Sequence, residues 1–222
     1  MRWTGSRMAK PRTSLEPPES LQGTLIEWGG GKTLYRIHRQ RFRANAFNPT
    51  PHGNARFSPI LDRNGNIIPT LYAGTTLDCA LMETVFHDVP YKTGFKPLPL
   101  SILEEQVHSA IEVKRNFRLL DLGTVALHKL GIKRSQLIDT TKALYPRTRR
   151  WAETFYQQFP AAQGLRWTSR QDDQSFAFVL FGNRVKASDL VSNSEPVPLI
   201  ENSEAILPVL ELAIRLGVTF VS

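Results

Sequence analysis

The chain has 222 residues, a hydrophobic fraction of 41%, a formal net charge of +8 and one cysteine. This length and apolar content predict one domain with a sizeable core, together with tails. No run of apolar residues in the sequence is long enough for a membrane-spanning helix. The lone Cys79 excludes an internal disulfide and a cysteine-cluster metal site, and it fits a reducing, cytoplasmic setting.

The positive charge favours acidic partners, a class that includes nucleic acid, phosphorylated small molecules and acidic proteins. Residues 1–22 are basic and contain proline and serine without an apolar central region. They predict a disordered tail and not a secretory signal. The remaining residues, 23–222, are expected to form a single domain without internal repeats.

The first expected strands flank a glycine-rich turn. Residues 25–28 favour a short strand, and residues 33–39 alternate so that Arg36 lies in mid-strand. The intervening Gly-Gly-Gly-Lys-Thr does not fit a phosphate-binding loop, because its first glycine is missing and a strand follows it. A guanidinium in mid-strand needs an anion or a water-filled groove, since burying it unpaired is costly.

Two further short strands and a helix follow. Residues 55–58 are expected to form a strand that carries Arg56, and Asn64-Gly65 is a strong hairpin turn signal. The strand at residues 71–73 carries Tyr72 and leads through Gly74 into a helix that Thr75 or Thr76 caps. Glu83 falls off the apolar stripe of that helix, so it is either solvated or positioned over a cleft.

The second half of the chain alternates short strands and helices. In chain order we expect a loop over 90–99, strands over 100–103, 107–113 and 118–122, helices over 124–130 and 149–159, strands over 164–169 and 176–181, and a helix over 201–216 with a break at Pro208. Ser169 ends one of these strands, and function concentrates where strands end. The alternative for Ser169 is a hydroxyl that bonds its own turn.

Two kinds of site are improbable from the spacing. No two of the five histidines share metal-ligand spacing with a carboxylate on one element, which argues against zinc. No Gly-x-Ser-x-Gly motif is present, which argues against a serine hydrolase.

Five segments together resemble one family, the RES domain. They are Leu34-Tyr35-Arg36-Ile37, Asn54-Ala55-Arg56-Phe57-Ser58, Leu71-Tyr72-Ala73-Gly74, Ala80-Leu81-Met82-Glu83-Thr84 and Gly164-Leu165-Arg166-Trp167-Thr168-Ser169-Arg170. The family is named for an arginine, a glutamate and a serine, which Arg36, Glu83 and Ser169 match. The resemblance runs from about residue 33 to 185. Asn54-Ala55 departs from the Gly-Gly that more often precedes the second arginine in the family.

This resemblance implies an α+β fold that is ADP-ribosyltransferase-like, with mixed and antiparallel sheets flanked by short helices. It implies a toxin of a bacterial toxin–antitoxin pair that takes NAD+ as substrate and holds no prosthetic group. The implied partner is an Xre-like antitoxin with a helix-turn-helix part, and a homodimer within that complex is compatible with it. Membrane attachment and direct nucleic-acid binding are not expected, and the expected location is the cytoplasm.

The chemistry of NAD+ cleavage assigns roles to the candidate residues. Arg36 and Arg56 suit a pyrophosphate, because guanidinium groups match phosphate oxygens. Glu83 is the candidate for stabilising an oxocarbenium-like ribose. Tyr72 can stack on nicotinamide, and Ser169 can bond the ribose or the nicotinamide amide. The expected catalytic residues are therefore Glu83, Arg36 and Ser169, and the expected NAD+-binding residues are Arg36, Arg56, Tyr72 and Ser169, with no metal.

Three functions remain open from the sequence. The first is a toxin that degrades NAD+ as a glycohydrolase or phosphorylase. The second is a protein-directed mono-ADP-ribosyltransferase. The third, from another class, is a non-catalytic basic domain that binds nucleic acid, although no helix-turn-helix or RNA-binding aromatic signature is present.

Overall fold

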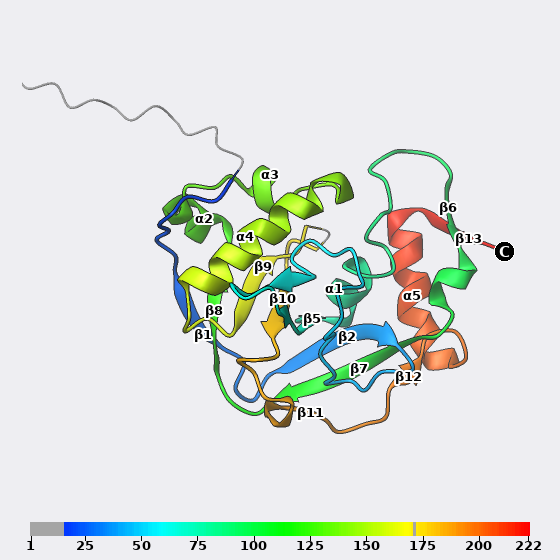
Figure 1. Ribbon diagram of the computed structural model, residues 1–222. Helices are drawn as coiled ribbons and strands as arrows, with labels where there is room; N and C mark the ends of the chain where they lie inside the picture. Colours follow the sequence, from blue (N-terminus) through cyan, green and yellow to red (C-terminus); the bar gives the residue numbers. More distant parts are fainter. Residues whose placement is uncertain (1–15, 171) are drawn as a thin grey trace, which may run out of the picture.

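One long mixed sheet runs through the molecule, as the computed structural model in Figure 1 shows; it describes residues 16–170 and 172–222. The strand order is β1-β8-β9-β10-β5-β2-β7-β11, and β12 also pairs with β7. Strands β8 and β9 run parallel, whereas the other neighbours are antiparallel. Two small sheets pair β13 with β6 and β3 with β4.

The strands are β1 (Leu25–Trp28), β2 (Thr33–Arg39), β3 (Ile60–Leu61), β4 (Ile67–Ile68), β5 (Thr70–Gly74), β6 (Lys96–Pro99), β7 (Gln106–Val113), β8 (Phe117–Asp121), β9 (Gly164–Thr168), β10 (Phe176–Phe181), β11 (Leu190–Ser192), β12 (Val197–Pro198) and β13 (Val218–Val221). The helices are α1 (Leu77–Met82), α2 (Thr124–Leu130), α3 (Arg134–Leu137), α4 (Tyr145–Gln158) and α5 (Ser203–Leu216), with short 3-10 turns η1 (Leu100–Leu103), η2 (Lys142–Leu144) and η3 (Ala187–Asp189). The predicted α+β architecture, with mixed and antiparallel sheets and short flanking helices, is confirmed.

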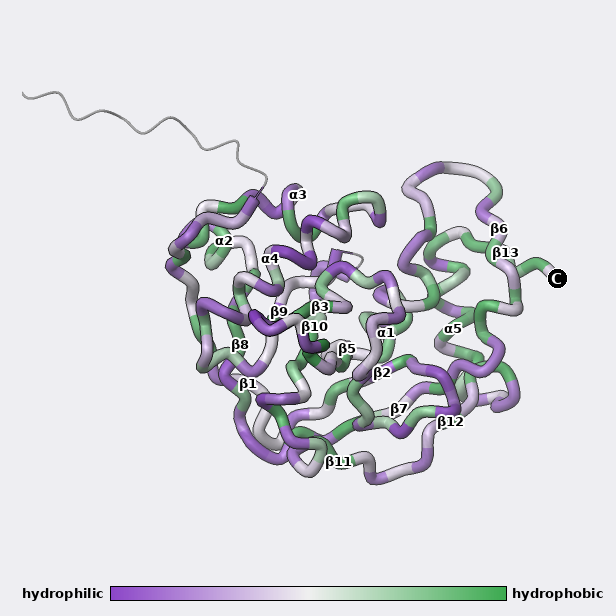
Figure 2. The backbone as a smooth tube through the Cα atoms, in the orientation of Figure 1, coloured by the Kyte–Doolittle hydropathy of each residue, from purple (hydrophilic) through white to green (hydrophobic). Residues whose placement is uncertain are grey.

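Strand β10 is the centre of the core, as its continuous apolar sequence predicts. Ala177, Val179 and Phe181 point into a cluster covered by α4, whereas Phe178 and Leu180 point into a second cluster on the opposite face. Figure 2 shows the hydrophobic stretches of the chain gathered around β5 and β10. Each such side chain contributes about 1.5–3 kcal/mol by leaving water, so the middle of the sheet is the most strongly held part of the scaffold.

The sheet opens between β5 and β2. Strand β2 pairs with β7 over its whole length and β5 pairs with β10 over its whole length, yet β2 and β5 share a single registered pair, Tyr35 with Gly74. Two well-paired halves therefore meet at one point. Beyond that point the two strands bound a cleft instead of continuing the ladder.

The junction from β5 to α1 forms as the sequence predicts. The Thr76 side chain caps the helix by accepting a hydrogen bond from the Cys79 backbone N–H at 3.0 Å. The helix is short, however, and ends at Met82, so Glu83 is its C-terminal cap instead of an interior residue. Three of its buried residues, Ala80, Leu81 and Met82, pack in the same cluster as Val209 and Leu212 of α5.

Several predicted elements are wrong. Residues 55–58 form a tight turn in which the Ala55 N–H donates to the Ser58 carbonyl, and no strand partner extends it. Residues 100–103 form a 3-10 turn that buries one residue, and the predicted loop over 90–99 contains β6. Strand β6 exists because β13, distant in sequence, pairs with it.

Two helices differ from their predicted limits. Helix α4 begins at Tyr145, four residues before the expected start. Helix α5 continues through Pro208 without a break. A proline inside a helix costs about 3 kcal/mol, and the burial of the residues that follow it offsets this cost.

The end of the predicted N-terminal tail contacts α4. Gln158 binds this segment: its amide donates to the backbone carbonyls of Pro18 and Glu19, and its carbonyl accepts from the Leu21 N–H at 2.7 Å. Residues 1–15 lie outside the described residues. Among the described residues, no helix has the length and apolar character that crossing a membrane requires.

We expect Gly74→Ala to destabilise the fold by about 1–3 kcal/mol, because overpacking at a tight contact has this cost. A Cβ at Gly74 would lie 2.9 Å from the Cys79 sulfur and 3.1 Å from the Ala80 nitrogen. Urea denaturation measures the change. Adding Cys79→Ala removes one of the clashing atoms, so the double variant should lose less stability than the sum of the single changes; strict additivity would contradict the contact.

Candidate active site

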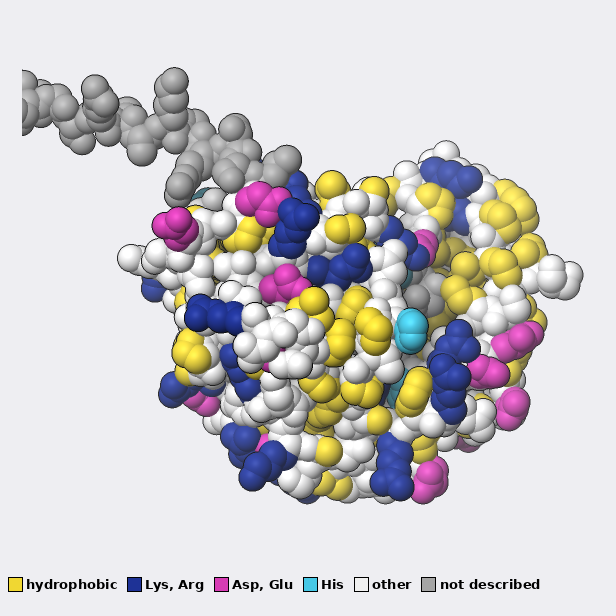
Figure 3. Space-filling model, in the orientation of Figure 1, with side chains coloured by type: hydrophobic (Ala, Val, Ile, Leu, Met, Phe, Trp, Pro, Cys, Tyr) yellow, Lys and Arg dark blue, Asp and Glu magenta, His cyan; other side chains and the backbone are white. Residues whose placement is uncertain are grey.

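A cleft of about 330 Å³ opens where β2 and β5 separate. Figure 3 shows the surface hollowed between the part that carries α4 and the part that carries α5. Strands β2 and β5, the end of α1, the turn at residues 54–56 and the start of α4 all contribute to its walls. The lining residues are Arg36, Ile37, Asn54, Ala55, Arg56, Tyr72, Ala73, Ala80, Glu83, Thr84, His87, Asp88, Lys142, Tyr145 and Ala177.

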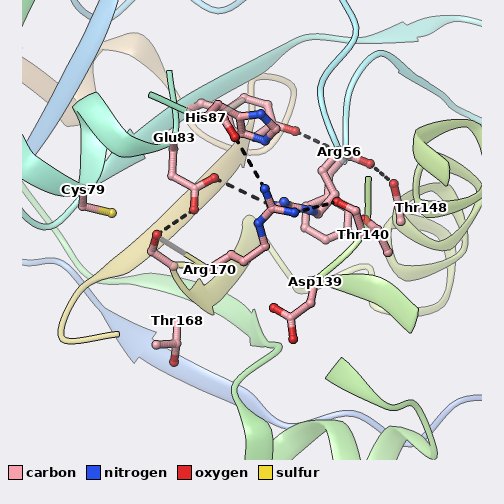
Figure 4. Close-up of polar contacts among 12 residues, drawn as sticks. Arg56, Cys79, Glu83, His87, Asp139, Thr140, Thr148, Thr168 and Arg170 are labelled. Carbon is pink, nitrogen blue, oxygen red and sulfur yellow. Dashed lines mark hydrogen bonds and ion pairs between the residues drawn. The ribbon is translucent and has the colours of Figure 1, made fainter. Parts of the chain in front are cut away.

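Glu83 lies in this cleft with a partner on each carboxylate oxygen. The Ser169 hydroxyl donates to Oε1 at 2.8 Å, and the Arg56 Nη1 lies 3.6 Å from Oε2. Figure 4 shows the Glu83 and Arg56 side chains pointing toward one another. The Glu83 side chain is 14% exposed, so one charged group faces the cleft while its orientation is held from two sides.

Arg56 is a buried cation with spare hydrogen-bond donors. Its side chain is 3% exposed, and its Nε and Nη2 have no hydrogen-bond partner among the described residues. The Tyr145 ring lies 5.7 Å from the guanidinium carbon of Arg56. The backbone carbonyl of Arg56 accepts a hydrogen bond from the Thr148 hydroxyl. Unsatisfied buried donors cost about 1–3 kcal/mol each, more when charged, and the positive charge that Arg56 places at the cleft favours an anionic ligand there.

Arg36 joins the cleft to the loop that follows β2. Its Nη1 donates to the carbonyls of Ala44 at 2.7 Å and Ala46 at 2.8 Å. Burial lowers the pKa of Arg36 to about 10, so the group stays charged at neutral pH. One nitrogen of the predicted anion-binding arginine therefore holds a loop in place.

Tyr72 lies on the wall of the cleft and is held at its hydroxyl. The Phe57 N–H donates to this hydroxyl at 2.9 Å, and the Trp167 ring lies edge-on at 6.2 Å between centroids. Burial raises the pKa of Tyr72, so its hydroxyl stays protonated. Tyr72 thus fixes the turn that carries Arg56.

Ser169 differs from the other four predicted residues because it does not line the cleft. It is fully buried at the end of β9, where it donates to Glu83 and accepts from the Asp172 N–H at 3.2 Å. Its hydroxyl contacts Glu83 and the Asp172 backbone. The predicted contact with ribose or nicotinamide stays a prediction.

The sequence matches the model of a known protein family. That model, described as the RES domain, covers residues 33–200. The chain belongs to the RES domain family. No curated protein matches the sequence.

The RES domain of this chain is also similar in fold to a solved structure. The MbcT toxin in the crystal structure of the M. tuberculosis MbcT–MbcA toxin–antitoxin complex aligns with a TM-score of 0.57 at 17% sequence identity. The alignment covers 77% of this chain and 84% of that chain. At this identity the similarity shows the shared fold alone.

The cleft of this RES domain contains four residues that the sequence analysis did not select. The Tyr145 hydroxyl lies 2.7 Å from the His87 Nε2, the His87 Nδ1 lies 2.9 Å from an Asp88 carboxylate oxygen, and Lys142 pairs with the other Asp88 oxygen. The sequence gives no local signal for this group, because His87 and Asp88 lie beyond the end of α1 and Lys142 and Tyr145 come from a distant segment.

Arg170 is a further residue that the sequence analysis missed. Its guanidinium donates to the carbonyls of Thr140 at 3.1 Å and His87 at 3.4 Å, as Figure 4 shows. It thereby ties the segment after α1 to the segment after α3. Among the described residues, no group of three His, Cys, Asp or Glu side chains is arranged to hold a metal ion.

His38 should make the stability of this RES domain depend on pH. It follows Arg36 by two residues on β2, and its ring nitrogens bond the Ser109 hydroxyl at 2.9 Å and the Arg39 carbonyl at 3.1 Å. Burial, together with the Arg36 charge, lowers the pKa of His38 from 6.5 to about 4. Between pH 6.5 and pH 4 the His38 side chain therefore binds a proton in the unfolded chain but not in the folded chain, which lowers the free energy of unfolding.

We expect the free energy of unfolding to fall by about 2 kcal/mol between pH 6.5 and pH 4, since one pKa unit is about 1.4 kcal/mol and partial solvation reduces the effect. His38→Gln should flatten this part of the profile, because glutamine does not titrate. Chemical denaturation across this range measures it, with His128→Gln at an exposed histidine as control. An unchanged slope in His38→Gln would assign the pH dependence to other groups.

Proposed function

We propose that this protein is the toxin of a type II toxin–antitoxin pair and that it cleaves the nicotinamide–ribose bond of NAD+ in this cleft. The observation that carries the proposal is the pair formed by Glu83 and Arg56. One cleft holds a carboxylate oriented by two partners and, 3.6 Å away, a buried guanidinium with two nitrogens that have no hydrogen-bond partner among the described residues. NAD+ combines an anionic pyrophosphate with a sugar that becomes cationic in the reaction.

The arginines bind the pyrophosphate in this proposal. Arg56 supplies a buried positive charge, and Arg36 supplies a second desolvated positive charge that also lines the cleft. Hydrogen bonds from ionised donors to phosphate oxygens are about twice as strong as neutral ones. Because Arg36 also holds Ala44 and Ala46, its contribution depends on the loop after β2.

Glu83 stabilises the reacting sugar. When the bond to C1′ of the ribose breaks, nicotinamide leaves with the electron pair and positive charge develops on the sugar ring. A preorganised carboxylate beside that ring stabilises the charge without reorganisation. Nicotinamide leaves as a neutral molecule, so no protonating acid is required. Tyr72, on the same wall, is placed to stack on the nicotinamide ring.

Ser169 is a positioning residue in this scheme. Its hydroxyl reaches Glu83 from the buried side and leaves the other carboxylate oxygen near Arg56. The three residues that name the family thus divide into one that binds the anion, one that stabilises the sugar and one that orients the carboxylate.

The acceptor of the ADP-ribosyl group distinguishes the alternatives. Transfer to water makes the protein a glycohydrolase, transfer to phosphate makes it a phosphorylase, and transfer to a side chain makes it a protein-directed mono-ADP-ribosyltransferase. Product identification with and without phosphate, and a search for a labelled protein, separates these outcomes.

The proposed partner is an Xre-like antitoxin with a helix-turn-helix part, bound in the cytoplasm. The similar fold of a toxin solved together with its antitoxin supports a protein partner, and the net charge of +8 favours an acidic surface on it. Co-purification of this chain with a helix-turn-helix protein from its native cells tests this proposal.

We expect Glu83→Gln to lower nicotinamide release by about 10²- to 10³-fold, as the loss of one preorganised electrostatic group does. The substitution preserves size and hydrogen bonding but removes the charge. Chromatographic detection of nicotinamide measures the rate, and circular dichroism verifies the fold. Glu211→Gln, at an exposed position on α5, is the matched control.

A folded Glu83→Gln variant that releases nicotinamide at the wild-type rate would remove Glu83 from catalysis. A wild-type protein that releases none, and instead binds DNA with steep salt dependence, would favour the nucleic-acid-binding alternative.

We expect Ser169→Ala to lower kcat by about tenfold to 10²-fold with little change in KM, because a hydrogen bond to a charged group is worth about 1.5–3 kcal/mol. A residue that orients Glu83 acts on the transition state, whereas a residue that binds ribose raises KM. Steady-state kinetics with NAD+ separates the two, with Ser194→Ala at an exposed serine as control. A rise in KM at constant kcat would restore the predicted contact with substrate.

A further inference from the structure

A chain of four side chains runs along the wall of the cleft from solvent to its interior. Lys142 pairs with Asp88, Asp88 lies 2.9 Å from the His87 Nδ1, and the His87 Nε2 lies 2.7 Å from the Tyr145 hydroxyl. Lys142 and Asp88 are 50% and 60% exposed at the side chain, whereas His87 is 16% exposed and Tyr145 is buried. All four residues line the cleft that holds Glu83.

The donor and acceptor groups of these side chains decide which atom donates each hydrogen bond. An ionised carboxylate accepts and cannot donate, so the Asp88 contact assigns the proton of neutral His87 to Nδ1. Nε2 is then an acceptor, and the Tyr145 hydroxyl donates to it. The remaining lone pair of the Tyr145 oxygen is therefore available to accept a proton from a group in the cleft.

Charged groups face this chain from several elements. Arg56 on the 55–58 turn lies against the Tyr145 ring, Arg170 after β9 binds the His87 carbonyl, and Glu83 lies at the end of α1. Burial raises the pKa of Tyr145, although the Arg56 and Arg170 charges oppose this. Tyr145 therefore stays protonated at rest, and it gives up its proton only while it receives another.

The reaction requires a destination for one proton. When an acceptor with an O–H group attacks the ribose, that proton must leave the acceptor oxygen. Both Glu83 oxygens already have partners, in Ser169 and Arg56. A chain of contacts that leads from the cleft to solvent begins at Tyr145.

We propose that Tyr145, His87 and Asp88 form a proton relay that activates the acceptor in the second half of the NAD+ reaction. This inference rests on the proposed function. As the acceptor oxygen bonds to C1′ of the ribose, its proton passes to the Tyr145 oxygen, and the Tyr145 proton passes to the His87 Nε2. The products are neutral tyrosine and an imidazolium held by the Asp88 carboxylate, and solvent at Asp88 then takes the proton. Asp88 orients the imidazole in the way that the carboxylate of a catalytic triad does.

The test measures kcat and KM for NAD+ against pH in the wild type, Tyr145→Phe and His87→Gln. Phenylalanine keeps the ring against Arg56 but removes the hydroxyl, and glutamine keeps a polar group but cannot take a proton. We expect each variant to lower kcat by about 10²-fold or more with near-wild-type KM, as the loss of a general base does. We also expect kcat to depend less on pH in both variants than in the wild type, because each substitution removes one member of the relay.

Tyr156→Phe is the matched control, because Tyr156 lies on the same helix but contacts Asn183 and Arg184 away from the cleft. Wild-type kcat and an unchanged pH dependence in Tyr145→Phe would overturn the relay while leaving NAD+ cleavage intact. No nicotinamide from the wild type would instead contradict the proposed function and the relay with it.

The tautomer gives a readout that does not depend on activity. Nitrogen-15 NMR of labelled histidine should show His87 protonated at Nδ1 in the wild type, and Asp88→Asn should shift this equilibrium. A resting Nε2-protonated ring would overturn the relay, because it could not accept the Tyr145 proton.

Discussion

The structure of the cleft depends on the contact of Glu83 with Arg56 and Ser169. A largely buried carboxylate needs compensation, and a buried guanidinium needs it as well. The 55–58 turn, the end of α1 and the end of β9 supply the three groups, so this contact ties together segments that are distant in the sequence. On the side of Arg56 the compensation is incomplete, because two of its nitrogens have no hydrogen-bond partner among the described residues. The positive charge of Arg56 is therefore only partly compensated, which lowers stability and also favours an anionic ligand in the cleft.

The scaffold makes this contact possible by interrupting its own sheet. One half of the sheet consists of β1, β8, β9, β10 and β5, and the other half consists of β2, β7, β11 and β12. β5 and β2 share one registered pair, Tyr35 with Gly74. The residues that would continue the ladder, among them Arg36 on β2 and Tyr72 on β5, line the cleft instead. The cap at Thr76 starts α1 at this point, and the helix is short enough that Glu83 lies at its end, over the opening. Helix α5, which lies beyond the span of the family match, packs on the buried side of α1 and has an ion pair between Arg215 and Asp78 at 2.8 Å.

Two arginines, Arg36 in the cleft and Arg170 behind its wall, also hold loops in place. Arg36 holds the carbonyls of Ala44 and Ala46, and Arg170 holds those of Thr140 and His87. A guanidinium has five donors in a fixed plane, so it can brace a loop with one nitrogen and keep others for a ligand. Loop geometry and charge in the cleft are therefore coupled. A change in the loop after β2 would move a cation that the proposed reaction uses.

The sequence by itself determined the local elements whose cause is local. The alternation of β2, the apolar run of β10, the Asn64-Gly65 turn and the cap at Thr76 follow from periodicity and from the backbone preferences of single residues. It also identified four residues of the cleft, Arg36, Arg56, Tyr72 and Glu83, through the family resemblance.

Only the tertiary structure decided the features that depend on partners distant in the chain. Strand β6 requires β13, Ser169 lies behind Glu83 because β9 pairs with β10, and the chain from Lys142 to Tyr145 exists because α4 packs next to the residues after α1. No single window of sequence contains both partners of these contacts. Their burial and hydrogen bonding follow from which segments the sheet brings together.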